Sequence, residues 1–208
     1  MKKNTKKIRS QCTYGPAVRP VSEKIRAFLS VDLDDSALLS RVAYIQSKLD
    51  RDSAKIKLVE SDSIHFTLRF FGDVSIAVSD QMHDCLKEIR FQPFDITISG
   101  VGAFPSPRRP NVIWVGVSRN HELVRELKKR IDESLATLGY TPEKDFTPHA
   151  TIARVKAVKN RDRLSANLAS IASEAVGTLV VDRFRLTKSV LTPTGPIYST
   201  VWEVPGRA

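Results

Sequence analysis

The chain has 208 residues and a net charge of +10, and its 41% hydrophobic and 27% charged residues are ordinary for a globular protein. No apolar run approaches the roughly 18 residues of a membrane helix, and the first residues lack the apolar core of a secretory signal. The two cysteines, Cys12 and Cys85, lie far apart without neighbouring His or Cys, which argues against a zinc site or a disulfide framework. We therefore expect a cytoplasmic protein with reduced thiols and no membrane association.

Basic residues are concentrated at the N-terminus. Residues 1–25 contain seven Lys and Arg residues and one Glu, which leaves a net charge of only +4 for the rest of the chain. The segment contains Gly15, Pro16 and Pro20 and has no helical or strand periodicity, so residues 1–24 are predicted to be a disordered basic extension. A basic chain suggests a polyanionic partner, but the body is only mildly basic.

The first half of the body predicts four strands and two helices. Runs of β-branched and aromatic residues indicate strands at 25–33, 55–59, 64–71 and 94–104. The first helix is predicted from an apolar stripe at Leu38, Val42, Ile45 and Leu49. The second begins after Ser75 as N-cap, with its stripe at Val78, Met82, Cys85 and Ile89.

The second half predicts strands at 112–117, 149–158, about 178–191 and 197–204. A third helix is predicted between Asn120 as N-cap and Gly139, with an inward stripe of Leu123, Leu127, Ile131 and Leu138. A fourth is predicted to end at Gly177, with its stripe at Leu164, Leu168, Ile171 and Ala175. Because strands and helices do not alternate strictly, we expect an α+β fold with largely antiparallel sheets.

Two of the four histidines share a local motif. His65 and His149 are each followed by Thr two residues later, as His65-Phe66-Thr67-Leu68 and His149-Ala150-Thr151-Ile152. Thr is about one residue in sixteen, so chance gives such a pair roughly 2% of the time. One motif occurs in each half of the chain, which suggests an internal duplication without a clear sequence repeat.

The spacing of the motif has a physical reason, because residues i and i+2 of a strand share a face. His65 and Thr67 are predicted to point one way, and Phe66, Leu68 and Phe70 into a core. Two such strands side by side would present two imidazoles and two hydroxyls to one groove. The imidazoles can act as an acid–base pair near neutral pH, and the hydroxyls can hold phosphoryl oxygens. This arrangement suits phosphodiester cleavage without a metal.

A structural explanation remains open for either motif alone, since a strand His is usually half-buried and Thr is common in strands. His83 and His121 are expected to be solvated surface residues. Other phosphate or nucleotide motifs are absent: the sequence has no Gly-x-x-x-x-Gly-Lys-Ser/Thr loop, no complete Gly-x-Gly-x-x-Gly and no Gly-x-Ser-x-Gly. Neither His-x-x-x-His nor an Asp cluster suggests a metal.

The two His-x-Thr motifs resemble the signature of the two-histidine phosphoesterase superfamily, and in it the archaeal-type RNA 2′,3′-cyclic phosphodiesterases, also named 2′-5′ RNA ligases. Five further segments resemble blocks of that family: residues 26–33, 70–73, 101–110, 112–117 and 191–198. The resemblance covers residues 25–204, which we expect to form a single bilobed, pseudo-symmetric domain with helices outside and a central groove.

The resemblance implies hydrolysis of RNA 2′,3′-cyclic phosphate ends to 2′-phosphomonoesters, with 2′-5′ ligation as the possible reverse reaction. It implies His65 as proton donor, His149 as proton acceptor, and Thr67 and Thr151 as phosphate contacts. Arg154 is a further candidate phosphate contact, although simple alternation would put it opposite His149. We expect no cofactor and no metal, and a monomer that acts on RNA ends, tRNA fragments among them.

Two rival functions stay open. A catalytically silent RNA- or nucleotide-binding module would use the same groove and the basic extension, and turnover of a small cyclic nucleotide distinguishes it from an enzyme. A ribosome- or tRNA-associated scaffold would lose function on deletion of residues 1–24 but not on substitution of His65. The extension itself could be an RNA-attracting arm, a remnant of expression or the product of a misassigned start codon.

Overall fold

The computed structural model describes residues 23–143, 145–193 and 195–207. Residues 1–22, most of the predicted extension, lie outside the described residues, and Lys24 begins the first strand. In chain order the elements are β1 (Lys24–Asp32), α1 (Ser36–Ser47), β2 (Ala54–Leu58), η1 (Ser61–Ser63), β3 (His65–Ser75), α2 (Ile76–Leu86), β4 (Phe94–Phe104), β5 (Val112–Arg119), α3 (His121–Ala136), β6 (His149–Val158), α4 (Arg161–Ser170), β7 (Ala175–Val181), β8 (Arg183–Leu191) and β9 (Pro196–Pro205).

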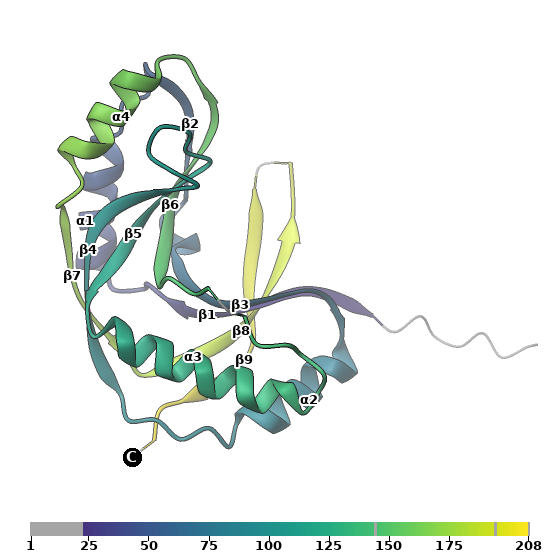
Figure 1. Cartoon of the computed structure of the whole chain (residues 1–208). Helices are drawn as coiled ribbons and strands as arrows, with labels where there is room; N and C mark the ends of the chain where they lie inside the picture. The colour runs from purple at the N-terminus through teal and green to yellow at the C-terminus, as the bar shows by residue number, and fades with distance from the viewer. Residues whose placement is uncertain (1–22, 144, 194, 208) are drawn as a thin grey trace, which may run out of the picture.

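All the strands belong to one curled sheet in the order β7-β4-β5-β6-β3-β1-β8-β9, with β2 paired to the outer part of β6. Every neighbouring pair in this sheet is antiparallel. The curl divides the sheet into a first arm (β7, β4, β5, β6 and β2) and a second arm (β3, β1, β8 and β9), which meet at a corner (Figure 1). The predicted α+β fold with two lobes and antiparallel strands is confirmed, and both lobes share one sheet.

The two arms join through a narrow contact between β3 and β6, the strands that carry the His-x-Thr motifs. The register of this contact is fixed by one residue pair, Phe66 opposite Ala150. Both side chains are buried, with exposures of 1% and 0%, so the strands meet through the core side of the sheet. The other side of the same strands is left for the polar residues of the motifs.

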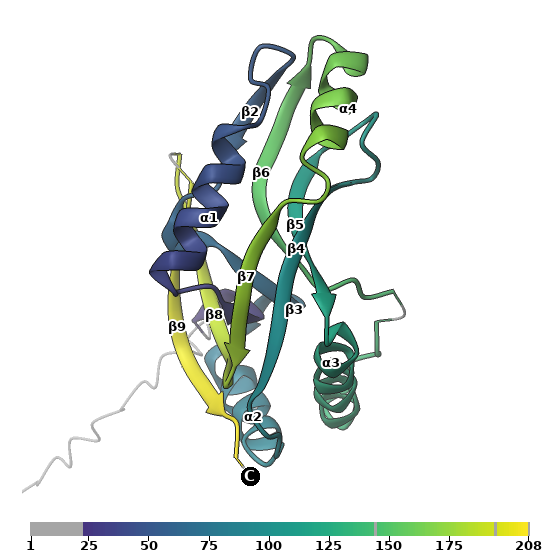
Figure 2. The same cartoon turned by 90° about the vertical axis from the view of Figure 1, so that its left-hand side faces the viewer.

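The helices lie on the outer side of the curl. α1 packs on β7 and β6 of the first arm, whereas α2 packs on β3 of the second arm and on α3. Figures 1 and 2 show α1 and α4 along the first arm, with α2 and α3 at the other end of the molecule. α1 directly follows β1 of the second arm, so the chain crosses between the arms before it forms either histidine strand.

Several predicted elements coincide with the structure. β4 and β6 have the predicted limits, and Ser75 caps α2 by accepting a hydrogen bond of 3.2 Å from the backbone N–H of Val78. In the first helix, the predicted stripe is buried at Leu38, Val42, Ile45 and Leu49. Local periodicity is therefore a sufficient guide where an element packs with one uninterrupted face.

The predicted stripe of the third helix was wrong at Leu123, which is 39% exposed. The buried apolar stripe of α3 is instead Val124, Leu127, Ile131 and Leu135. Asn120 occupies the N-cap position, but its φ is 60° and its side chain donates to the carbonyl of Asp95 instead of capping the helix. The cap position alone therefore did not determine which face of the helix is buried.

The prediction for the fourth helix was wrong at its C-terminus. α4 ends at Ser170, and Ala175 is the first residue of β7. Gly177 lies inside this strand, where an added Cβ would approach the Leu38 side chain to 2.5 Å, so the glycine allows α1 to pack closely on β7. The predicted strand over 178–191 is two strands, β7 and β8, separated at Asp182.

Candidate active site

A cavity of about 350 Å³ lies at the junction of β3 and β6. The structure places all five predicted site residues on its wall: His65, Thr67, His149, Thr151 and Arg154. Because β3 and β6 are antiparallel with Phe66 opposite Ala150, each histidine lies beside the threonine of the other motif along the junction. The junction thus places the two copies of the motif antiparallel to each other on the wall of one cavity.

Both imidazoles are held in the same way. Nδ1 of His65 lies 2.9 Å from the carbonyl oxygen of Ser63, and Nδ1 of His149 lies 2.7 Å from the carbonyl oxygen of Thr147. A carbonyl oxygen only accepts, so each Nδ1 carries the proton and donates it. Nε2 of each ring therefore remains available to take up or release a proton.

The two histidines differ in their surroundings. The His65 ring stacks on Phe28 at a centroid distance of 4.7 Å and meets the edge of Tyr198 at 5.2 Å. Burial among these rings lowers the pKa of His65 below its ordinary value of 6.5, whereas the Ser63 carbonyl and the Asp32 carboxylate act in the opposite direction. The His149 ring instead lies beside the rings of Phe104 and Trp114, at centroid distances of 4.9 Å and 6.0 Å.

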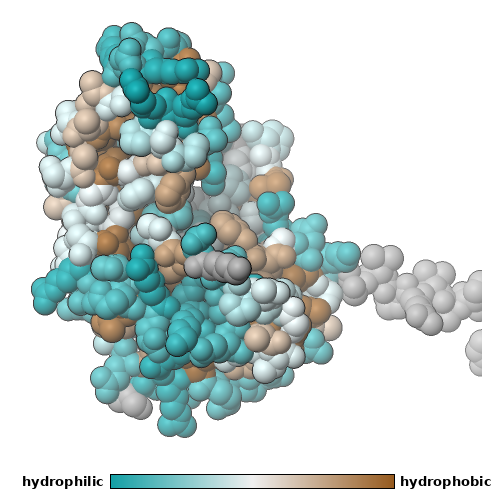
Figure 3. Space-filling view, in the orientation of Figure 1, coloured by the Kyte–Doolittle hydropathy of each residue, from teal (hydrophilic) through white to brown (hydrophobic). Residues whose placement is uncertain are grey.

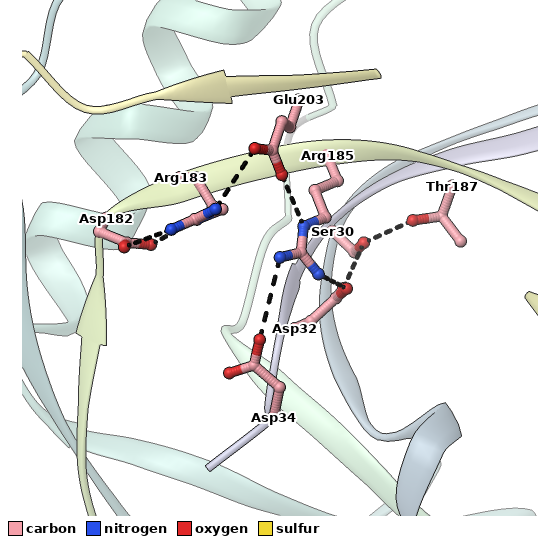
Figure 4. A network of polar contacts seen from close by, with 8 residues as sticks. All are labelled: Ser30, Asp32, Asp34, Asp182, Arg183, Arg185, Thr187 and Glu203. Carbon is pink, nitrogen blue, oxygen red and sulfur yellow. Dashed lines mark hydrogen bonds and ion pairs between the residues drawn. The ribbon is translucent and has the colours of Figure 1, made fainter. Parts of the chain in front are cut away.

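Asp32 connects His65 to a polar network on the second arm. Asp32 is the partner of His65 in the β1–β3 register. Its carboxylate accepts hydrogen bonds from Ser30 at 2.9 Å and from Arg185 at 2.6 Å, and Arg185 also pairs with Glu203 at 3.2 Å (Figure 4). The hydrogen bond from Arg185 therefore holds the Asp32 carboxylate in place on the strand beside His65.

A bulge in each histidine strand corrects two predictions. The pairing of β5 with β6 skips Ile152, and the pairing of β1 with β3 skips Leu68, the equivalent residue of the other motif. A bulge shifts the alternation of the strand by one residue. Arg154 therefore faces the cavity, on the same side as His149, and not the opposite face that simple alternation gives. Phe70, predicted in the core, is 68% exposed and also lines the cavity.

Sequence reasoning missed several residues of the cavity wall. Lys57 and Lys156 add positive charge, and Tyr198 and the residues before it close the side formed by β8 and β9. Tyr198 belonged to a segment that resembled the family, so a signal for it was present. Lys57 could be placed only through the pairing of β2 with β6, where it lies opposite Arg154.

A curled antiparallel sheet that brings two His-x-Thr strands to one cavity defines a phosphoesterase of the two-histidine class. The model of the family described as LigT-like phosphoesterase matches residues 33–114 and 115–198, one stretch for each motif. The chain belongs to this family. The two matched stretches agree with the duplication that the paired motifs suggested.

Relatives with known names cover most of the chain. The RNA 2′,3′-cyclic phosphodiesterase of Methanothermobacter thermautotrophicus is 40% identical over 178 residues, which are 85% of this chain and 96% of that protein. The protein of the same name from Archaeoglobus fulgidus is 40% identical over 174 residues, 84% of this chain and 96% of the relative.

Solved structures share the fold. TT0787 of Thermus thermophilus matches with a TM-score of 0.72 at 24% identity, over 88% of this chain and all of that chain. Escherichia coli LigT complexed with 3′-AMP matches with a TM-score of 0.71 at 20% identity, over 89% of this chain and all of that chain. In the part of the chain that the structure describes, no helix has the length and apolar character needed to cross a membrane.

Proposed function

We propose that this protein hydrolyses the 2′,3′-cyclic phosphate at the end of an RNA chain to a 2′-phosphomonoester. The observation that carries the proposal is the pair of imidazoles whose Nδ1 atoms are fixed by backbone carbonyls while both rings line one cavity. The name that the archaeal relatives share supports the same reaction. A silent binding module would have no need for two acid–base groups held in this way.

In the proposed reaction, His149 takes a proton from water, and the water oxygen attacks the cyclic phosphorus. The bond from phosphorus to the 3′-oxygen breaks, and His65 gives its proton to that oxygen, so the phosphate remains on the 2′-oxygen. Thr67, Thr151 and Arg154 would hold the non-bridging oxygens as negative charge develops on them.

If His65 is the acid, its ring must be protonated when the substrate is bound. Burial lowers the pKa of His65 in the free protein, which favours the neutral ring. A cyclic phosphate in the cavity carries negative charge and would favour the protonated ring. The proposal therefore requires that substrate binding raises the pKa of His65, and a pH–rate profile of kcat, which reports the bound state, tests it.

The cavity also has a surface suited to a nucleobase. Phe70 stands next to the phosphate-binding side chains with 68% of its area exposed. Exposure of a large aromatic side chain costs stability that burial would provide, and base stacking on such a ring contributes about 1–3 kcal/mol. We propose that the base of the terminal nucleotide stacks on Phe70.

The test is hydrolysis of an RNA that ends in a 2′,3′-cyclic phosphate, with EDTA present. We expect turnover by the wild type, a 2′-phosphate product, and a loss of about 10²–10⁴-fold in kcat for His65→Ala and for His149→Ala. The matched controls are His83→Ala and His121→Ala, since neither residue lines the cavity.

Three results would contradict the proposal. They are inactivity of a folded wild type, abolition of turnover by EDTA, and equal losses in the control variants. Inactivity with retained nucleotide binding would favour the binding module. Loss of function only after removal of residues 1–24 would favour the scaffold.

We further propose that residues 25–204 form the complete catalytic unit, so that a chain without residues 1–22 retains turnover of a cyclic mononucleotide. We propose a cytoplasmic monomer that acts on RNA ends such as those of tRNA fragments. Sedimentation of the purified protein tests the monomer. A second sedimenting species at micromolar concentration would contradict it.

A further inference from the structure

Four cations form a continuous row from the cavity along the first arm. Lys57 and Arg154 are partners in the β2–β6 register, and both line the cavity together with Lys156. Lys55 is two residues from Lys57 on β2, and both are exposed while Ile56 between them is buried. Residues i and i+2 share a face of a strand, so Lys55 continues the row away from the histidines. We name Lys55, Lys57, Arg154 and Lys156 the cation row.

Positive charge exceeds negative charge along the row. Among the described residues that line the cavity, Glu60 is the only carboxylate beside three cations. Within the same described part of the chain, no ion pair involves Lys55, Arg154 or Lys156. The part of the wall formed by Lys57, Arg154 and Lys156 is therefore suited to a negatively charged ligand. Figure 3 shows that the end of the first arm is also hydrophilic on the face toward the viewer, over the turn between β4 and β5.

A single phosphate would not use the whole row. Lys55 and Lys57 stand about 6.6 Å apart along β2, twice the rise of a strand. One phosphate group at the histidines is reached by Arg154, but it does not extend to the outer end of the row. A ligand that contacts every member must carry several negative charges in succession.

The segment between β8 and β9, which also lines the cavity, differs in kind from the cation row. The segment presents Leu191, Pro193, Pro196 and Tyr198. Leu191 and its neighbour Ile197 are 66% and 61% exposed. A chain of phosphates that leaves the cavity would lose hydration against this apolar wall, whereas the cation row attracts it. The cation row, and not these apolar side chains, therefore suits a polyanion that leaves the cavity.

We infer that the cation row binds the backbone phosphates of the RNA nucleotides that precede the cyclic end, so that the protein acts on RNA chains in preference to mononucleotides. The inference rests on the proposed function, which places the cyclic end between His65 and His149. It adds a second phosphate-binding surface, along which Lys156 and Lys55 contact successive phosphates. Counterion release makes such contacts salt-dependent.

The test compares two substrates with the same terminal nucleotide: adenosine 2′,3′-cyclic phosphate, and an RNA of about eight nucleotides that ends in it. The variant Lys55→Ala/Lys156→Ala is compared with Lys87→Ala/Lys129→Ala, which removes the same charge from the end of α2 and from α3. We expect the ratio of kcat/KM for RNA to that for the mononucleotide to fall by roughly five- to tenfold in the first variant and not in the control.

Binding of a fluorescent RNA, measured by anisotropy, gives a readout that does not depend on turnover. Each phosphate contact to a single strand contributes about 0.7 to the slope of log K against log salt, so the first variant should lose about 1.4 from that slope. An unchanged ratio with an unchanged slope would overturn the inference, as would equal losses on both substrates, which would assign the two lysines to the cyclic end alone. Failure of a folded wild type on both the RNA and the mononucleotide would instead overturn the proposed function.

Discussion

The side chain of Gln46 donates a hydrogen bond of 2.8 Å to the carbonyl of Ile152, the residue at which the second histidine strand bulges. Gln46 lies on α1 and is 8% exposed. Its second donor reaches the carbonyl of Val59, also at 2.8 Å, and the backbone N–H of Val59 donates to Ile152 as well. A helix of the outer layer therefore fixes the bulge that turns Arg154 into the cavity.

Replacing Gln46 by Leu removes this support, and we expect the effect to act through Arg154. Since a hydrogen bond to a charged group contributes about 1.5–3 kcal/mol, Arg154→Ala should lower kcat/KM by roughly 10- to 100-fold. Gln46→Leu should cause part of that loss, mainly as a higher KM. The double variant should lose no more than Arg154→Ala alone, because both changes remove one contact.

The exposed Gln81 on α2 provides the control, as Gln81→Leu. Steady-state kinetics on the cyclic mononucleotide measure all the variants beside the wild type. Additive losses in the double variant would show that Gln46 does not act through Arg154.

The stability of the fold should depend on pH through His65. Burial lowers the pKa of His65 in the folded state below its ordinary value of 6.5, so the unfolded chain binds this proton more readily. The contribution of neutral His65 to the free energy of unfolding is fully present above pH 6.5 and is lost as the pH falls through the pKa of His65 in the folded state. His65→Gln removes the titration, so its free energy of unfolding should decline less than that of the wild type between pH 8 and pH 5.

Urea unfolding at several pH values in that range measures the difference. His121→Gln is the comparison, because the His121 side chain is 44% exposed at the start of α3. If the free energy of unfolding depended on pH in the same way for the wild type and for His65→Gln, His65 would titrate equally in the folded and unfolded states.

A buried ion network fastens the first histidine strand to α3. Asp132 pairs with Arg69 of β3 and, at 2.7 Å, with Lys128, and all three side chains are at most 7% exposed. Arg69 also donates to the carbonyl of Thr141, in the segment that leads to His149. Asp132→Asn would leave the buried Arg69 beside a neutral amide and Lys128 with only the exposed Glu143, at 3.0 Å, and we expect a loss of about 3–5 kcal/mol in the free energy of unfolding.

The neighbouring variant Glu133→Gln should change stability little, because the Glu133 side chain is 62% exposed and its pair with Lys129 spans 3.8 Å. Urea unfolding of the two variants and the wild type measures both changes in the free energy of unfolding. Similar midpoints for Asp132→Asn and Glu133→Gln would mean that solvent reaches the network.

The sequence predicted what local patterns determine. The limits of β4 and β6 follow from residues within each strand, and the paired motifs pointed to one cavity because i and i+2 share a face. The bulges at Leu68 and Ile152 have no local signal, since they depend on pairing with strands distant in the chain. This non-local cause explains the wrong placement of Phe70 in the core.

Polar residues inside helices were missed for a related reason. Lys128 and Asp132 are one turn apart on α3 and look like a solvated pair in the sequence, but they are buried because Arg69 lies against them. Arg69 itself points to the core side only because β3 bulges at Leu68. One irregularity of pairing thus determines an exposed aromatic ring, a buried arginine and a buried ion network.

Phe66 and Phe70 should respond to substitution in opposite ways, although both belong to β3. Phe66 is 1% exposed at the junction of the two arms, so Phe66→Ala should cost about 3–5 kcal/mol of stability. Phe70 is 68% exposed on the cavity wall, so Phe70→Ala should leave the urea midpoint almost unchanged. If the terminal base stacks on Phe70, the variant should raise KM for a cyclic nucleotide by roughly five- to 100-fold.

The conservative variant Phe70→Tyr keeps an aromatic face and should keep KM near the wild-type value, whereas Phe70→Leu keeps an apolar side chain without a ring and should resemble Phe70→Ala. Ribose 2,3-cyclic phosphate, which has no base, serves as the substrate that cannot stack. Its KM should be the same for the wild type and the three Phe70 variants, because only the phosphate contacts remain. A KM for the base-free substrate that rises with Phe70→Ala would assign Phe70 to the shape of the phosphate site and not to base recognition.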